Sequence, residues 1–152
     1  MVDFKELPLP LLDCPREPAE YNKQYPDANV QKWSAIADAA DGFVLVVPEY
    51  NYGYTAVLKN ALDWLYPELR YKAFGFVGVS TGQVGGARAI AQLRNVIGSF
   101  NAFDIRENVM FGAVAKAFDG HGQLIDESYL KKIDGFIKSL GSAAEKMRGF
   151  RL

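Results

Sequence analysis

The chain has 152 residues, of which 49% are hydrophobic, and its 17 basic and 18 acidic residues give a formal net charge of −1 at pH 7. This length suits one domain with a substantial core, and the near balance of charge gives no electrostatic reason to expect nucleic acid or an acidic membrane surface as a partner. The single cysteine, Cys14, excludes a disulfide framework. No stretch approaches the roughly 20 apolar residues of a membrane span, and the N-terminus lacks the apolar run of a signal peptide. We therefore expect a cytoplasmic protein.

The first half of the chain predicts an extended segment, a helix and a strand. Residues 1–28 are rich in proline, which is typical of an extended surface segment. Residues 29–40 predict a helix, because apolar side chains recur there at helical spacing. These are Val30, Trp33, Ile36 and Ala37. Residues 42–47, "GFVLVV", form a short run without alternation, as expected of a parallel strand buried on both faces.

The rest of the chain alternates helices and strands. A helix capped by Thr55 buries Leu58, Ala61, Leu62 and Leu65 on one face. Next come a buried strand over 72–80, a glycine-rich loop, and a helix over 87–100 with Ile90, Leu93 and Ile97 inward. A third strand over 108–114 and a loop precede a final helix at about 126–147. This alternation predicts an α/β fold with a parallel sheet and helices on both faces.

Aromatic and amide side chains follow the first predicted strand without a break. Residues 48–66 read "PEYNYGYTAVLKNALDWLY", and residues 80–86, "STGQVGG", follow the next strand. In parallel α/β sheets, ligands bind beyond the carboxyl ends of the strands. Both stretches are therefore expected to face the binding crevice.

The chain offers poor material for catalysis by side chains alone. Its one histidine, His121, lies in a glycine-bounded loop, where a histidine is more often solvated than catalytic. No Cys/His cluster could hold zinc, and neither a G-x-S-x-G elbow nor a Walker sequence occurs. "GVSTGQVGGARA" lacks the G-x-G-x-x-G spacing, so a dinucleotide fingerprint is not supported.

The two loops suit the binding of a flat heterocycle with amide-like edges. Asn51 offers a donor and an acceptor, the backbone of residues 48–52 adds more, and three tyrosines can cover an aromatic face. These are Tyr50, Tyr52 and Tyr54. The N–H groups of residues 82–86 open a helix whose positive end can stabilise negative charge on a ring. A flavin fits this description and would carry the chemistry itself. The alternative is that these are ordinary turn and packing residues.

The same residues carry a resemblance to a known family. "VVPEYNYGYTAVLKNALDWLY" resembles the signature of the NADPH-dependent FMN reductase family, and "STGQVGGARAIAQLR" resembles its next loop and helix. "VDFKELPLPLLD" is similar to the family's segment after its second strand, so the likeness runs from about Val2 to Glu127. The resemblance implies a flavodoxin-like fold, a three-layer sandwich with a parallel sheet, as a single domain over residues 1–152.

The resemblance also implies which residues hold the isoalloxazine ring of FMN. Residues after the first strand would edge the ring, and residues after the second would lie at its pyrimidine side. They are Pro48, Glu49, Tyr50, Asn51, Tyr52, Ser80, Thr81, Gly82 and Gln83. No metal ligand and no catalytic side chain is expected. Thr55 departs from the family, in which proline is common at the helix start, and a threonine cap replaces that proline without difficulty.

By this resemblance the chain is an FMN-dependent NAD(P)H oxidoreductase. Hydride would pass from NAD(P)H to FMN and on to a quinone, flavin, azo compound or similar small-molecule acceptor. A second hypothesis is a non-catalytic flavodoxin-like binding or assembly module, and a third is an electron carrier, which the small net charge disfavours. Family members commonly pair through the helix that contains "LKNALDWLY", so a homodimer or homotetramer is expected.

One departure from the family lies upstream. Family members begin with a strand, a phosphate-binding loop rich in Ser, Thr and Arg, a helix and a second strand, whereas Met1 here falls at the tail of that second strand. We expect either a truncated chain, a misplaced start or a partner that covers the gap. In any of these cases the run at residues 43–47 is an apolar strand with an unpaired edge within this chain.

Overall fold

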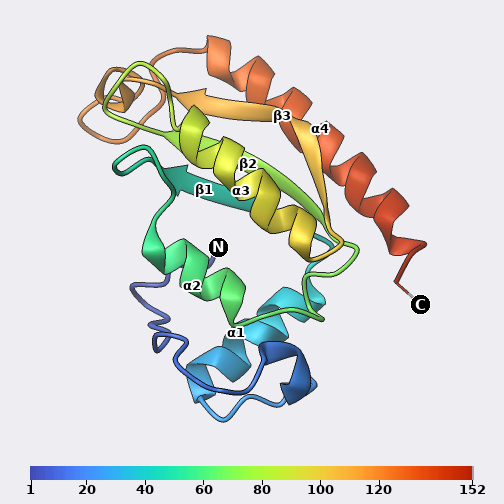
Figure 1. Cartoon of the computed structure of the whole chain (residues 1–152). Coiled ribbons are helices and arrows are strands. Elements are labelled where there is room, and N and C mark those ends of the chain that lie inside the picture. The colour runs from blue at the N-terminus through green and yellow to red at the C-terminus, as the bar shows by residue number, and fades with distance from the viewer. Residues whose placement is uncertain (152) are drawn as a thin grey trace. The chain divides into compact units, whose positions relative to one another are not determined.

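The computed structural model describes residues 1–151, which form two compact units. The first unit comprises Met1–Ala40 and Ala56–Arg70, and the second comprises Asp41–Thr55 and the chain from Tyr71 onward. The order of the elements along the chain is shown in Figure 1. The two units are described in turn.

The first unit holds the short helix η1 (Pro18–Tyr21), α1 (Ala28–Ala39) and α2 (Ala56–Asp63). The carboxylate of Asp27 caps α1 by accepting from the backbone N–H groups of Asn29 and Val30, at 2.9 and 3.0 Å. Of the predicted apolar face, three members are buried and Ile36 is 39% exposed. The prediction of an extended surface segment over residues 1–28 is confirmed only in part, because turns at residues 4–6 and 22–23 and the helix η1 interrupt it, and Leu7 and Tyr25 are buried. The amide of Asn60 donates to the carbonyl of Pro10 at 2.9 Å.

A polar group lies at the centre of the first unit. Glu68 is fully buried, and its carboxylate accepts from the hydroxyl of Ser34 at 2.5 Å and from that of Tyr25 at 3.3 Å. Burial and the nearby Glu68 carboxylate raise the pKa of Tyr25 above its ordinary value. The indole N–H of Trp33 donates to the carbonyl of Ala61 at 2.8 Å. Every polar side-chain atom buried among the described residues has a hydrogen-bond partner.

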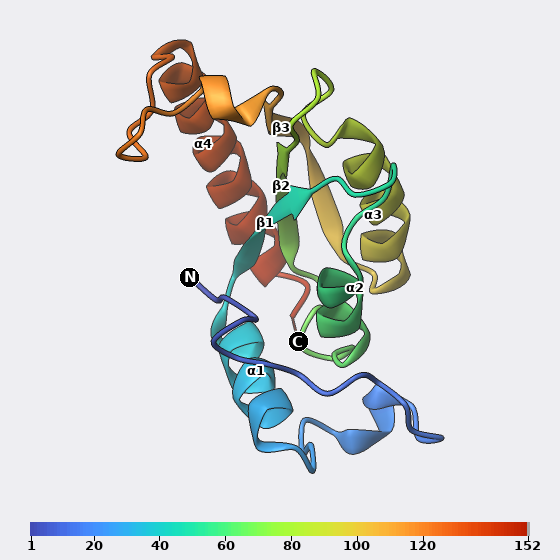
Figure 2. The same ribbon diagram turned by 90° about the vertical axis from the view of Figure 1, so that its left-hand side faces the viewer.

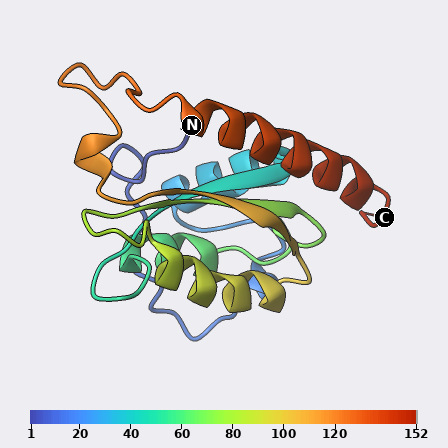
Figure 3. The ribbon, with the colours of Figure 1, turned by 90° about the horizontal axis from the view of Figure 1, so that it is seen from above.

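The second unit is a parallel sheet of β1 (Gly42–Pro48), β2 (Ala73–Val79) and β3 (Phe103–Phe111), in that spatial order. Two further helices, α3 (Ala87–Ser99) and α4 (Ser128–Arg148), lie on opposite faces of this sheet (Figure 2 and Figure 3). The short helix η2 (Val114–Lys116) follows β3. As predicted, Ile90, Leu93 and Ile97 of α3 are buried. The alternation of strands and helices in the sequence thus predicted the layers of this unit.

The third strand begins five residues earlier than predicted, at Phe103 instead of Asn108. Its first half alternates polar and apolar residues, because it is an edge strand whose outward side chains meet solvent. A bulge opposite Phe74 and Phe76 interrupts the pairing with β2. Arg94 of α3 lies over this irregularity, where it pairs with Asp104 and donates to the carbonyl of Ile105 at 3.2 Å. This edge of the sheet is therefore protected against further pairing.

The opposite edge of the sheet is formed by β1. Within the described residues β1 pairs with β2 alone, which confirms the unpaired edge that the sequence predicted. The expectation that β1 is buried on both faces is wrong for this chain, since Val44 and Val46 are 42% and 60% exposed. The reason is that α4 crosses the sheet diagonally. Near the end of the helix Ala144 lies close to Gly42 of β1, whereas at its start Tyr129 packs against β3. The carboxyl half of β1 is left uncovered on that face.

A charged cluster ties the end of α4 to the start of β1. The Asp41 carboxylate accepts from the Arg148 guanidinium at 3.0 Å and from that of Arg151 at 2.8 Å. Arg151 also donates to the carbonyls of Asp41 and Tyr71, at 2.6 and 3.2 Å. The hydrogen bonds from Arg148, followed in size by those from Arg151, lower the pKa of Asp41 from its ordinary 3.8 to about 2.

This shift predicts a pH-dependent contribution to stability. Because the folded-state pKa of Asp41 is depressed, its contribution is present at neutral pH and is lost as the pH falls from about 4 to about 2. We expect Asp41→Asn to lower the thermal unfolding midpoint at pH 7, and the difference from wild type to shrink over that window. Asp134→Asn is the control, because the ion pair between Asp134 and Lys138 is exposed to solvent and should contribute little to stability. A difference that stays constant between pH 7 and pH 2 would show that Asp41 acts through packing.

Candidate functional site

Three loops gather at one end of the sheet, because the strands are parallel and their carboxyl ends lie together (Figure 1). They are residues 49–55 after β1, 80–86 after β2 and 112–127 after β3. Backbone hydrogen bonds join these loops where they leave the strands. The N–H of Glu49 donates to the carbonyl of Val79, and the N–H of Ser80 to that of Phe111, both at 3.1 Å. The two stretches singled out in the sequence are therefore neighbours in space.

The loop after β2 is folded tightly upon itself. The hydroxyl of Ser80 donates to the carbonyl of Gly82 at 2.8 Å and accepts from the N–H of Gly85 at 3.0 Å. Two glycines outside the loop leave room for its backbone: a Cβ at Gly78 of β2 would overlap the carbonyl oxygen of Gly85, and one at Gly112 after β3 would overlap that of Gln83. Ser80 thus organises the loop, and its exposed side chains are those of Thr81, Gln83 and Val84.

Glu49 joins the loop after β1 to α3. Its carboxylate accepts from the backbone N–H groups of Arg88 and Ala89, at 3.1 and 3.4 Å, and from the Arg88 guanidinium at 2.8 Å. The hydrogen bond from Arg88 lowers the pKa of Glu49, and its side chain is only 7% exposed. The amino end of α3 was expected to face a ring; the structure instead places the Glu49 carboxylate there. Glu49 therefore acts by fastening the loop after β1 to the first turn of α3.

The stretch Tyr50–Gly53 forms a two-residue turn. Tyr50 and Gly53 exchange backbone hydrogen bonds of 3.0 and 2.9 Å, and Asn51 and Tyr52 both have left-handed backbones, with φ of 49° and 66°. A left-handed conformation is common for Asn but costs a residue with a bulky Cβ substituent about 1–2 kcal/mol. Glycine is the favoured residue at the second position of such turns. The presence of Tyr52 there needs an explanation other than local preference.

The predicted cofactor-binding residues divide into two groups. Pro48, Glu49 and Ser80 are engaged in the fold, since Pro48 pairs with Val79 at the end of β1. The others have exposed side chains or backbone at the strand ends. They are Tyr50, Asn51, Tyr52, Thr81, Gly82 and Gln83. Exposed amide groups from Asn51 and Gln83 with two exposed tyrosines fit the amide edges and the face of an isoalloxazine ring.

Two residues of α3 that bear on this site were not foreseen. Gln92 donates to the carbonyl of Tyr52 at 2.9 Å, and the Arg88 guanidinium carbon lies 4.2 Å from the centroid of the Tyr52 ring. Their spacing of four residues on one helix face was a signal, because it places both beside the same loop. His121 lies exposed in the loop after β3, as predicted.

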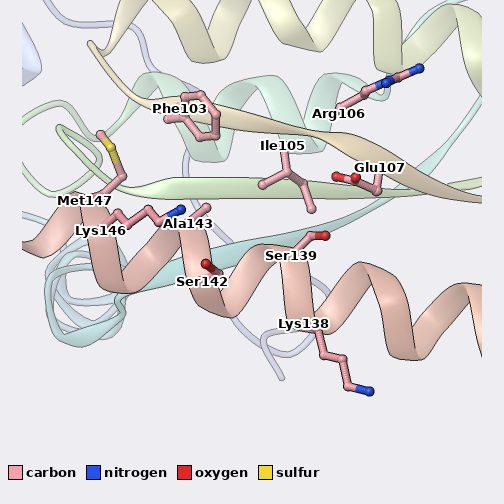
Figure 4. Close-up of a pocket in the computed structure, with 10 residues that line it drawn as sticks. All are labelled: Phe103, Ile105, Arg106, Glu107, Lys138, Ser139, Ser142, Ala143, Lys146 and Met147. Carbon is pink, nitrogen blue, oxygen red and sulfur yellow. The ribbon is translucent and has the colours of Figure 1, made fainter.

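A groove of about 520 Å³ lies elsewhere in the second unit, between the amino half of β3 and α4 (Figure 4). Ile105 and Ala143 form part of its apolar lining, with the hydroxyl groups of Ser139 and Ser142 beside them. The side chains of Arg106 and Lys138 point away from it (Figure 4). Its β3 residues precede the carboxyl half of that strand, so this groove is separate from the three loops.

Among residues 1–151, no group of three or more His, Cys, Asp or Glu side chains is arranged to hold a metal ion. Over the same range, no helix combines the length and the apolar character that crossing a membrane requires. The exposed groups of the three loops are therefore the candidate site.

Known proteins are similar to this chain in both sequence and fold. An NAD(P)H-dependent FMN reductase of Saccharomyces cerevisiae is 37% identical over 120 residues, which cover 76% of this chain and 59% of that protein. A quinone reductase of Escherichia coli is 32% identical over 127 residues, which cover 80% of this chain and 68% of that protein. The chain spans about half of a second FMN reductase, from Schizosaccharomyces pombe, which is 41% identical over 97 residues.

The structural comparison supports the same assignment of fold. The flavoenzyme NAD(P)H:(acceptor) oxidoreductase of Paracoccus denitrificans matches with a TM-score of 0.74 and 24% identity, over 92% of this chain and 77% of that one. The fold is thus flavodoxin-like, as predicted. The family model described as NADPH-dependent FMN reductase matches residues 1–116, which include the loops after β1 and β2. The chain belongs to the NADPH-dependent FMN reductase family.

Proposed function

We propose that this chain is an FMN-dependent NAD(P)H oxidoreductase whose acceptor is a quinone, a flavin, an azo compound or a similar small molecule. One observation carries the proposal. The loop after β1 is fastened by Glu49 to α3, the helix that follows the loop after β2, and the two loops expose amide and aromatic groups at the carboxyl ends of two adjacent strands. Relatives named as FMN and quinone reductases share this part of the sequence.

The residues of this chain would act by binding and orientation. FMN, when bound, supplies the transfer of hydride. Asn51 would hold a ring edge through its amide, together with backbone groups of residues 48–52. Thr81, Gly82 and Gln83 would contact the ring from the loop after β2. Tyr50 and Tyr52 would cover an aromatic face and exclude water from it.

The contribution of Asn51 can be separated from that of a general loop change. Asn51→Ala is expected to weaken FMN binding by about 1–3 kcal/mol, because a ring edge would lose its hydrogen-bonding partner. His121→Ala should cost little, since His121 is exposed and lies in another loop. Titration of each variant with FMN gives the dissociation constants. Equal losses would place the site elsewhere.

The same material tests the activity. The wild-type chain, loaded with an equivalent of FMN and kept free of oxygen, is expected to oxidise NAD(P)H catalytically only when a quinone or another acceptor is supplied. FMN binding without this activity would favour an electron carrier, and no FMN binding at all would favour the non-catalytic module. We further propose a cytoplasmic homodimer or homotetramer, in keeping with the resemblance, and sedimentation velocity distinguishes either from a monomer.

A further inference from the structure

Tyr52 is held in place by more contacts than an exposed turn residue needs. Its carbonyl accepts from Gln92, its ring lies against the Arg88 guanidinium, and Arg88 is itself fixed by Glu49. Gln92 and Arg88 belong to α3, and Glu49 belongs to the same loop as Tyr52. Tyr52 as a whole nevertheless remains 67% exposed, so packing in the core does not account for the arrangement.

The backbone of Tyr52 points in the same direction. Its left-handed conformation is one that glycine would adopt without strain at this position of the turn. Strained residues persist where the surrounding structure holds them, and they gather at sites of function. The left-handed backbone of Tyr52 therefore lowers the stability of the turn. The same turn fixes an aromatic ring in place outside the core.

We propose that Tyr52 is the residue against which a flat aromatic acceptor of the quinone type stacks. The Arg88 guanidinium covers one part of the ring and limits its rotation, and the exposed remainder offers a π surface to a planar ligand. This inference rests on the proposed function, and it adds which side chain selects the acceptor. A planar acceptor gains from the stack, whereas an octahedral one such as ferricyanide does not.

The test uses one variant that removes the ring and two that serve as controls. Tyr52→Gly removes the ring and relieves the backbone strain, whereas Tyr52→Phe keeps the stacking surface. Tyr71→Gly controls for strain relief, because Tyr71 is also left-handed, with φ of 56°, but precedes the amino end of β2. The full chain with FMN is used throughout, and urea unfolding reports the stability of each variant.

Two readouts are compared. In steady-state assays at saturating FMN, Tyr52→Gly should raise the KM for menadione about tenfold more than it raises the KM for ferricyanide. In direct titrations, its Kd for anthraquinone-2-sulfonate, a flat quinone probe, should rise by a similar factor. Tyr52→Phe and Tyr71→Gly should stay within twofold of wild type, and Tyr52→Gly should resist urea at least as well as wild type.

The failures of the two proposals are distinguishable. If the chain neither binds FMN nor oxidises NAD(P)H, the proposed function fails, and the probe titration still decides the role of Tyr52. An unchanged affinity of Tyr52→Gly for anthraquinone-2-sulfonate, or no binding of the probe by wild type, overturns the role of Tyr52. So does a loss with ferricyanide as large as that with menadione, because it would indicate general damage to the site.

Discussion

Gly78→Ala is expected to abolish FMN binding and to lower the free energy of unfolding by about 1–3 kcal/mol or more. A methyl group at residue 78 would overlap the carbonyl oxygen of Gly85 and press on the side chain of Ile90. The first of these is backbone and cannot rotate away. The loop after β2 must therefore move outward, which breaks its hydrogen bonds with Ser80 and displaces residues 81–83.

The control is a second glycine of the same unit. Gly98 lies in α3, and a Cβ there would meet no heavy atom within 4 Å. Gly98→Ala should leave FMN binding unchanged and stabilise the helix by about 0.5–1 kcal/mol. Chemical denaturation and FMN titration measure both variants. Wild-type affinity for FMN in Gly78→Ala would mean that the packing of this loop does not set the site.

Glu68→Ala is expected to destabilise the first unit by roughly 3 kcal/mol or more. The carboxyl group is fully buried and accepts from two hydroxyl groups, each of which would lose its acceptor at a cost of about 1–3 kcal/mol. Removing the side chain would also leave a cavity. Domains of this size are stable by only about 5–15 kcal/mol, so this loss is a large fraction of the whole.

Glu68→Gln is the matched variant, since it preserves the volume and keeps one carbonyl oxygen for the hydroxyl groups of Ser34 and Tyr25. We expect it to lose less than half as much as Glu68→Ala. Urea unfolding followed by tryptophan fluorescence reports on this unit directly, because Trp33 and Trp64 are buried in it. Equal losses in the two variants would contradict an explanation by volume and hydrogen-bond acceptance.

Local patterns in the sequence were sufficient to predict most of the elements. The β-branched runs of β1 and β2 and the apolar face of α3 gave their positions to within one or two residues. The start of β3 was missed because a bulge interrupts its pairing with β2, so that its polar first half lacks the apolar pattern of a regular buried strand. The burial of β1 was wrong because burial depends on what covers a strand, which its own residues do not specify.

The same distinction separates the residues of the site. Asn51 and residues 81–83 were predicted from local sequence, and they are exposed at the strand ends. The role of Glu49 could not be predicted, since it caps a helix whose first turn lies 39 residues further along the chain. Likewise, the left-handed backbone of Tyr52 could not be read from residue preference, because contacts from α3 hold it against that preference.

The cluster that ties Arg148 and Arg151 to Asp41 has a consequence for how the chain folds as it is made. These contacts span 107 and 110 residues. At a synthesis rate of about 5–20 residues per second, β1 leaves the ribosome roughly 5–20 s before the arginines that fasten its amino end. Until then β1 is held only by contacts formed earlier along the chain, chiefly its pairing with β2. The amino end of β1 is therefore fastened last, after the rest of the sheet has been synthesised.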